Sequence, residues 1–272
     1  MPVTVSLSTP YSVTAHNPEQ AFDVFVPAEA HGKALPGRAL VVAIHGGWWH
    51  QGHHQDLRAF CLALTEHGWP AASVGFRHMA PPGANPGPEH IRSGVEVIQD
   101  VMSALPKIVE EAALLGWDGN SIVLLGSGSG SLTALVAASR LTLERKPGVR
   151  VRACIACGVT PSLDHADGLA PALSAIVDRF AGRDRHILSP VHLTAHGYPP
   201  LLLLHGDKDV DVPVALVQKL HMKVAGAGES SAIQVLAGLG HHFIESPFSP
   251  AGKLAMERIL PFLAEHAIEP AD

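Results

Sequence analysis

The stretch SIVLLGSGSGSLTALVAASRL, residues 121–141, decides the fold. It begins as a continuous apolar strand pattern, passes through a run of alternating glycines and serines, and continues as an apolar helical pattern. A buried strand that turns at once into a helix is the setting of a nucleophile elbow, G-x-S-x-G, whose central serine stands at the apex of the turn. In this chain the central residue is Gly128, and the serines are its neighbours, Ser127 and Ser129.

A phosphate-cradling glycine loop is the competing interpretation of this stretch. It is the weaker one, because no G-K-[ST] sequence follows and the G-x-G-x-x-G spacing fails at Thr133. The rest of the chain carries no nucleotide, flavin or nicotinamide signature, so no organic cofactor is predicted.

Short apolar runs alternate with longer helical patterns along the whole chain. Strands are expected at residues 3–8, 21–27, 39–47, 70–77, 121–127, 151–159, 199–207 and 232–240. Helices are expected at residues 55–67, 91–115, 129–145, 213–227 and 251–267. This alternation predicts an α/β fold: a mostly parallel central sheet of about eight strands flanked by helices. No linker interrupts it, so residues 1–272 are expected to form a single domain.

Composition narrows the class of protein. Hydrophobic residues make up 47% of the chain and charged residues 16%, which favours a compact domain over disorder. The net charge of −6 gives no electrostatic reason to expect nucleic acid or an anionic membrane as partner. The apolar runs are too short to span a bilayer, and the first residues do not resemble a signal peptide. We therefore expect a cytoplasmic enzyme with a small-molecule substrate or ligand; a homodimer remains one possibility.

Cys154 and Cys157 form a C-x-x-C motif inside an expected buried strand. Side chains three residues apart on a strand point to opposite faces of the sheet. The two thiols should therefore diverge, and the motif predicts neither a redox pair nor a zinc site.

Ligands of open α/β sheets bind beyond the carboxyl ends of the strands, which directs attention to the residues there. One strand ends in AIHGGWW, so that His45, Gly46 and Gly47 precede Trp48 and Trp49. Glycines at this place let backbone N–H groups approach a ligand and stabilise an oxyanion. The alternative is an ordinary glycine turn with two tryptophans packed at the surface.

Two later strand ends carry acids and histidines. Asp207, Asp209 and Asp211 follow the apolar run at 199–206, and His241 and His242 follow the last expected strand. A carboxylate that fixes the tautomer of an imidazole gives a general base. Any one of these groups could be a solvated loop residue. Along the chain, the candidate oxyanion loop at HGGWW comes first, then the elbow, the acids and the histidines. This order favours a catalytic site.

These landmarks resemble the α/β-hydrolase superfamily, and within it the esterase group that includes kynurenine formamidase. The resemblance covers roughly residues 20–265. It is carried by HGGWWHQGHHQDLRAF at 45–60, LSPVHL at 188–193, PPLLLLHGDKDVDVP at 199–213 and GLGHHF at 238–243.

The resemblance implies roles for particular residues. Asp209 matches the triad acid and His241 the triad base, whereas Asp207 and Asp211 match no triad position. His242 stands where a small residue is common. The backbone N–H groups of Gly47, Trp48 and Ser129 would form the oxyanion hole, with His45, Gly46 and Trp49 beside the substrate. The family's elbow reads like G-H-S-A-G-G, so Gly128 takes the place of the nucleophile.

Gly128 leaves several interpretations open. Hydrolysis could proceed through a displaced serine, Ser127 or Ser129, although neither neighbour of the apex should point at the histidine. Alternatively, His241 and Asp209 could activate water in place of the missing hydroxyl. The same pair could serve a lyase, isomerase or cyclase, or the site could bind a ligand without chemistry. A glycine introduced in place of a natural serine is a further reading, although alanine is customary. We favour an esterase- or arylformamidase-like hydrolase of small acyl esters or amides.

The histidines after the oxyanion loop raise the question of a metal. His50, His53 and His54 lie close to His45, but they lack a helical i, i+4 pair and an evident partner acid. No metal is therefore predicted. Trp48 and Trp49 are expected to wall the pocket, and the segments 79–90 and 164–168 to form loops over it.

Overall fold

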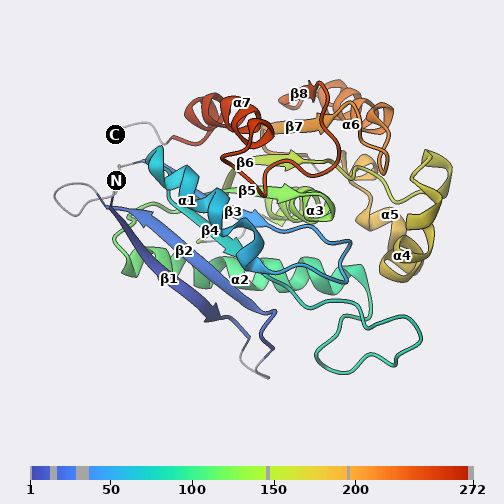
Figure 1. Ribbon diagram of the computed structural model, residues 1–272, viewed down its shortest axis with the longest axis horizontal. Helices are drawn as coiled ribbons and strands as arrows, with labels where there is room; N and C mark the ends of the chain where they lie inside the picture. Colours follow the sequence, from blue (N-terminus) through green and yellow to red (C-terminus); the bar gives the residue numbers. More distant parts are fainter. Residues whose placement is uncertain (1, 13–16, 29–36, 145–147, 195–196, 269–272) are drawn as a thin grey trace.

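Eight strands form one sheet in the computed structural model, which describes residues 2–12, 17–28, 37–144, 148–194 and 197–268 (Figure 1). The spatial order is β1-β2-β4-β3-β5-β6-β7-β8. Their bounds are β1 Val3–Pro10, β2 Ala21–Pro27, β3 Leu40–Ile44, β4 Ala71–Val74, β5 Ser121–Ser127, β6 Arg150–Cys157, β7 Leu201–Gly206 and β8 Ser231–Leu236. β2 pairs antiparallel with β1 and β4, and every other pair is parallel. The expected mostly parallel sheet is confirmed.

The helices follow the predicted pattern with two additions. They are α1 Arg58–Glu66, α2 Gly94–Leu114, α3 Ser129–Glu144, α4 Pro171–Ala181, α5 Arg185–Leu188, α6 Val214–Gly226 and α7 Pro250–His266. Short 3₁₀ turns are η1 His54–Leu57, η2 His165–Asp167, η3 Gly182–Asp184 and η4 Pro190–His192. No helix was predicted at α4 or α5. Pro171 occupies the first turn of α4, where a missing N–H costs no hydrogen bond.

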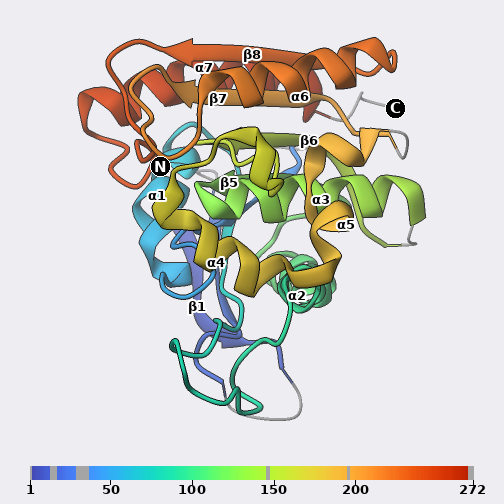
Figure 2. The same ribbon diagram turned by 90° about the vertical axis from the view of Figure 1, so that its right-hand side faces the viewer.

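The sheet separates two hydrophobic cores. Alternate residues of β3 show the division, because Leu40, Val42 and Ile44 join one core while Val41 and Ala43 join the other. Helices α2, α3, α4 and α6 supply buried side chains to the first core, and α1 and α7 to the second. Figure 2 shows α4 and α5 on the same side of the sheet as α3. Both faces of the central strands are therefore covered, which accounts for their continuous apolar sequences.

The two cysteines of the C-x-x-C motif lie on opposite faces of the sheet, as the two-residue period of a strand predicts. Cys154 packs in the first core and Cys157 in the second, and both thiols are free and buried. Burial raises the pKa of each thiol well above its ordinary value, so neither is present as a thiolate near neutral pH.

The carboxyl ends of the parallel strands β3, β5, β7 and β8 lie at one edge of the sheet. The residues expected to form the oxyanion hole, the acid and the base follow these ends, and Ser127 is the last residue of β5. Among the described residues, none of the helices combines the length and apolarity needed to cross a membrane.

Candidate active site

The corner between β5 and α3 has the backbone geometry of a nucleophile elbow. Gly128 has a φ of +54°, in the left-handed region that side chains rarely occupy, and α3 begins at the next residue. Close contacts at Gly126 and Gly130 explain why glycines recur at every second position here. A β-carbon on Gly126 would lie 2.2 Å from the carbonyl oxygen of Gly130, and one on Gly130 would lie 2.3 Å from that of Ile44. The tight corner therefore persists although the central serine is missing.

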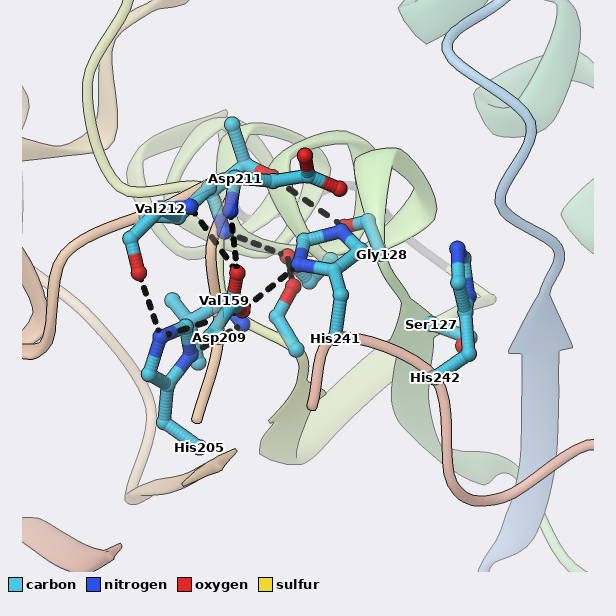
Figure 3. Close-up of polar contacts among 12 residues, drawn as sticks. Ser127, Gly128, Val159, His205, Asp209, Asp211, Val212, His241 and His242 are labelled. Carbon is cyan, nitrogen blue, oxygen red and sulfur yellow. Dashed lines mark hydrogen bonds and ion pairs between the residues drawn. The ribbon is translucent and has the colours of Figure 1, made fainter. Parts of the chain in front are cut away.

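Gly128 faces the predicted base. A β-carbon at this position would lie 3.2 Å from Nε2 of His241 and 3.3 Å from Cε1 of His242 (Figure 3). Two residues that are 113 positions apart (241 minus 128) thus meet at one point. The structure brings together the elbow and the histidine that the sequence assigned to one site.

Asp209 orients the imidazole of His241. Oδ2 of Asp209 accepts a hydrogen bond of 2.7 Å from Nδ1 of His241, which leaves Nε2 directed to the corner as the proton acceptor. Oδ1 of Asp209 accepts two more hydrogen bonds of 2.9 Å, from the N–H groups of Asp211 and Val212. Burial alone would raise the pKa of the Asp209 carboxyl, but these hydrogen bonds and the charge of His241 lower it below its ordinary value. Asp209 is thus held as a carboxylate.

His205 contacts the carboxylate of Asp209, and the sequence analysis did not single it out. Its side chain is fully buried; Nδ1 accepts the N–H of Val159 at 3.0 Å. Nε2 therefore carries the proton, which it donates to the carbonyl of Val212 at 2.9 Å, and it lies 3.2 Å from Oδ2 of Asp209. Burial lowers the pKa of His205, so this imidazole stays neutral. Its place within LHGDKD was the only signal in the sequence.

The loop after β3 arches over the corner. Gly47 has a φ of +102°, and Trp48 and Trp49 have φ values of +48° and +59°. Side chains in this region cost of order 1–3 kcal/mol each, a strain that concentrates at functional sites. The ring of Trp48 stacks on that of His241, with centroids 5.7 Å apart and planes 9° from parallel. The strained loop therefore holds the indole ring of Trp48 against the imidazole of His241.

One predicted oxyanion donor already has an acceptor. The N–H of Trp48 donates to Oγ of Ser129 at 2.8 Å. The N–H of Ser129 itself belongs to the first turn of α3, where backbone donors lack intrahelical acceptors. The Ser129 hydroxyl thus lies against the loop after β3.

Ser127, the other displaced-serine candidate, has a different partner. Its hydroxyl donates to Oε1 of Glu245 at 2.5 Å, and the same oxygen lies 3.2 Å from Nδ1 of His242. Burial favours a higher pKa for the Glu245 carboxyl, but the hydrogen bonds from His242 and Ser127 lower it overall. The hydrogen bond to Glu245 raises the pKa of His242. Neither Ser127 nor Ser129 is bonded to His241.

A cavity of about 1030 Å³ lies on the side of His242 and Gly46, and neither Gly128 nor His241 is among its lining residues. His45, Gly46 and Gly47 line it on one side, and His242 and Glu245 line it on another. His242 thus both lines the cavity and contacts the position of a β-carbon at residue 128. The buried imidazole of His45 stacks on Phe76, and burial lowers its pKa to about 3.

Neither Trp48 nor Trp49 lines this cavity, in contrast to the prediction of a pocket wall. Trp49 is the more buried of the two. Its side chain is fully buried and stacks on Phe180 of α4, with ring centroids 3.6 Å apart. The reason is α4 itself, which was not predicted and which covers the indole ring. Trp49 is a core residue that anchors the loop after β3.

The histidines after the loop do have acidic partners, contrary to the sequence analysis. Nε2 of His54 lies 3.6 Å from a carboxylate oxygen of Asp23, and His53 forms a capping box with Asp56 at the start of η1. Within the described residues, three potential metal-ligating atoms come within 4.8 Å of one another only at Asp209, Asp211 and His241. Two of these three, Asp209 and His241, are already hydrogen-bonded to each other.

Comparisons with known proteins agree with this geometry. The BD-FAE family model matches residues 22–224. Esterase LipQ of Mycobacterium tuberculosis is 24% identical over 84% of this chain and 56% of its own length, and Esterase LipC of the same organism is 26% identical over 84% and 58%. The chain thus spans somewhat more than half the length of these relatives.

Solved esterase structures share the fold. Esterase B from Lactobacillus rhamnosis superposes with a TM-score of 0.79 at 18% identity, covering 97% of this chain and 85% of its own. Propionate-bound esterase 2 from Thermogutta terrifontis gives 0.74 at 20% identity, covering 99% and 97%.

Proposed function

The chain belongs to the BD-FAE family and has the α/β-hydrolase fold of esterases; on that premise we propose that it hydrolyses small acyl esters or amides by activating water with His241 and Asp209. The observation that carries the proposal is that the corner at Gly128 faces Nε2 of His241, 3.2 Å from where a β-carbon of residue 128 would stand. Glycine provides no hydroxyl there, but the base, its acid and the oxyanion loop are assembled around it.

The reaction needs only the groups in this corner. A water molecule beside Gly128 would give a proton to Nε2 of His241 while its oxygen attacks the carbonyl carbon of the ester. Asp209 stabilises the imidazolium that forms. The N–H at the start of α3 and the loop at Gly47 face the developing oxyanion. No acyl-enzyme forms on this route.

The rate should be modest. In serine hydrolases, removal of the nucleophile costs on the order of 10⁶-fold in turnover, and the oxyanion hole and substrate binding supply what remains. Activated or small esters are therefore the expected substrates. Arylformamides belong to the same chemical class, and the resemblance of the HGGWW loop to that of formamidases supports testing them.

The test is a substrate panel of phenyl acetate, p-nitrophenyl butyrate and N-formylkynurenine. We expect turnover of at least one compound by the wild-type protein, and its loss in a His241→Ala variant purified identically. Replacement of His186, an exposed histidine on α5, serves as the matched control. Turnover that survives in His241→Ala would show that His241 is not the base. No turnover of any compound would contradict hydrolysis itself and leave a binding protein or a non-hydrolytic enzyme.

A further inference from the structure

Two histidine–carboxylate pairs flank Gly128. His241 is bonded through Nδ1 to Asp209 at 2.7 Å, and His242 through Nδ1 to Glu245 at 3.2 Å. The two rings are nearly perpendicular, with centroids 4.9 Å apart. A β-carbon at residue 128 would be 3.2 Å from the first ring and 3.3 Å from the second (Figure 3). The water-attack route proposed above needs only the pair of His241 and Asp209, so the second pair has no role in it.

We propose that His242, held by Glu245, is a general acid that protonates the leaving group during the hydrolysis proposed above. The inference rests on that proposed function. In a serine hydrolase, one imidazole serves both proton transfers, because the acyl-enzyme separates them in time. Direct attack by water places both transfers in one addition–elimination sequence. On this route a second imidazole carries out one of the two proton transfers in place of His241.

The protons balance as follows. The attacking water forms the new C–O bond and gives a proton to Nε2 of His241, while the carbonyl π electrons move to the oxyanion. When the oxyanion collapses, the bond to the alcohol oxygen breaks, and that oxygen takes the proton from Nε2 of His242. His241 then returns its proton to solvent and His242 regains one. The products are the carboxylic acid and the alcohol.

The surroundings of His242 suit this role. Its side chain is 54% exposed, so it can exchange protons with water, and it lines the cavity of about 1030 Å³ that could admit a leaving group. Glu245 bonds it directly, and the negative charges of Asp211 and Asp209, in the loop after β7, also favour its protonated form. Ser127 on β5 donates to the same Glu245 oxygen and fixes that carboxylate. Glu245 is thus a positioning residue for the imidazolium.

The experiment compares two acetate esters that differ only in the leaving group. p-Nitrophenyl acetate releases a stable phenolate, whereas benzyl acetate releases an alkoxide that needs a proton. In His242→Gln we expect kcat/KM for benzyl acetate to fall by about 10²-fold or more, the usual contribution of a general acid. p-Nitrophenyl acetate should be little affected. His186→Gln is the matched control.

The pH profile gives a second readout. The bond to Glu245 raises the pKa of His242, so benzyl acetate hydrolysis should persist above pH 6.5, the ordinary histidine value, before it declines. In Glu245→Gln the decline should begin at lower pH, while the profile for p-nitrophenyl acetate stays unchanged.

The outcomes separate this inference from the proposed function. Equal effects of His242→Gln on both esters, or no effect on either, would overturn the general acid while leaving His241 as the base. If His241→Ala keeps full activity toward both esters, or if the wild-type protein hydrolyses neither, the proposed function fails and the general acid fails with it.

Discussion

Gly128 lies opposite the proton acceptor of His241: a β-carbon built on the glycine would be 3.2 Å from Nε2 of the imidazole. The backbone at residue 128 keeps a φ of +54°, and the imidazole keeps its bond to Asp209. The tight corner and the imidazole–carboxylate pair are therefore assembled around a residue that has no side chain to act as a nucleophile.

Restoring the serine should restore covalent chemistry. We expect Gly128→Ser to form a fluorophosphonate adduct at residue 128, located by peptide mass mapping, while the wild-type protein and Gly128→Ala form none. A β-carbon would meet Cε1 of His242 at 3.3 Å, which is tight, so Gly128→Ser combined with His242→Ala should react faster than the single variant. The retained geometry would be refuted if both serine variants fold and neither reacts.

Asp209→Asn should impair ester hydrolysis by about 10²–10⁴-fold in kcat/KM, the range of general acid–base assistance. The neutral amide of asparagine cannot stabilise the imidazolium of His241. Its NH₂ group would also place a donor against the N–H of His205 or His241. Asp207→Asn is the matched control, because the side-chain oxygen of Asp207 only accepts the N–H of Gly238, which an amide oxygen can also do. Comparable losses in both variants would argue for a structural effect.

Acid should destabilise the fold through the buried His45 and His54 and the half-buried His78. Burial lowers the pKa of His45 to about 3 and those of His54 and His78 to about 4. The unfolded chain binds protons at these residues below pH 6.5 and the folded chain does not, so the stability that they contribute is full above pH 6.5 and falls between pH 6.5 and about 4. Each residue contributes a slope of up to about 1.4 kcal/mol per pH unit.

Chemical denaturation at several pH values measures this slope. We expect His54→Gln to flatten the pH dependence of the unfolding free energy between pH 6.5 and 4, and exposed His186→Gln to leave it unchanged. An unfolding free energy that stays constant over this interval in the wild-type protein would show that these imidazoles accept protons in the folded state.

The sequence predicted all eight strands because the central ones are continuously apolar, but it extended β3 and β4 by three residues and β8 by four at their carboxyl ends. Asp209, His241 and Gly128 could be placed together on this basis alone, since carboxyl ends of parallel strands share an edge. The bend of the elbow also followed from the glycine spacing.

Other features depend on packing that no local pattern encodes. Glu245 meets Ser127 across 118 positions, and its loop has no periodic signal. Trp49 was expected beside the substrate, but the unpredicted helix α4 brings Phe180 onto its ring. His205 looked like part of a buried strand, and only its three polar contacts reveal a positioning role.

The most direct test of water attack without an acyl-enzyme is the intact mass of the protein, quenched in acid during steady turnover of p-nitrophenyl acetate. Gly128→Ser, which supplies the missing hydroxyl, is the positive control and should carry an acetyl group. The account predicts wild-type protein of unchanged mass while p-nitrophenolate is still being released. An acetyl group on Ser127 or Ser129 of the wild-type protein would contradict it.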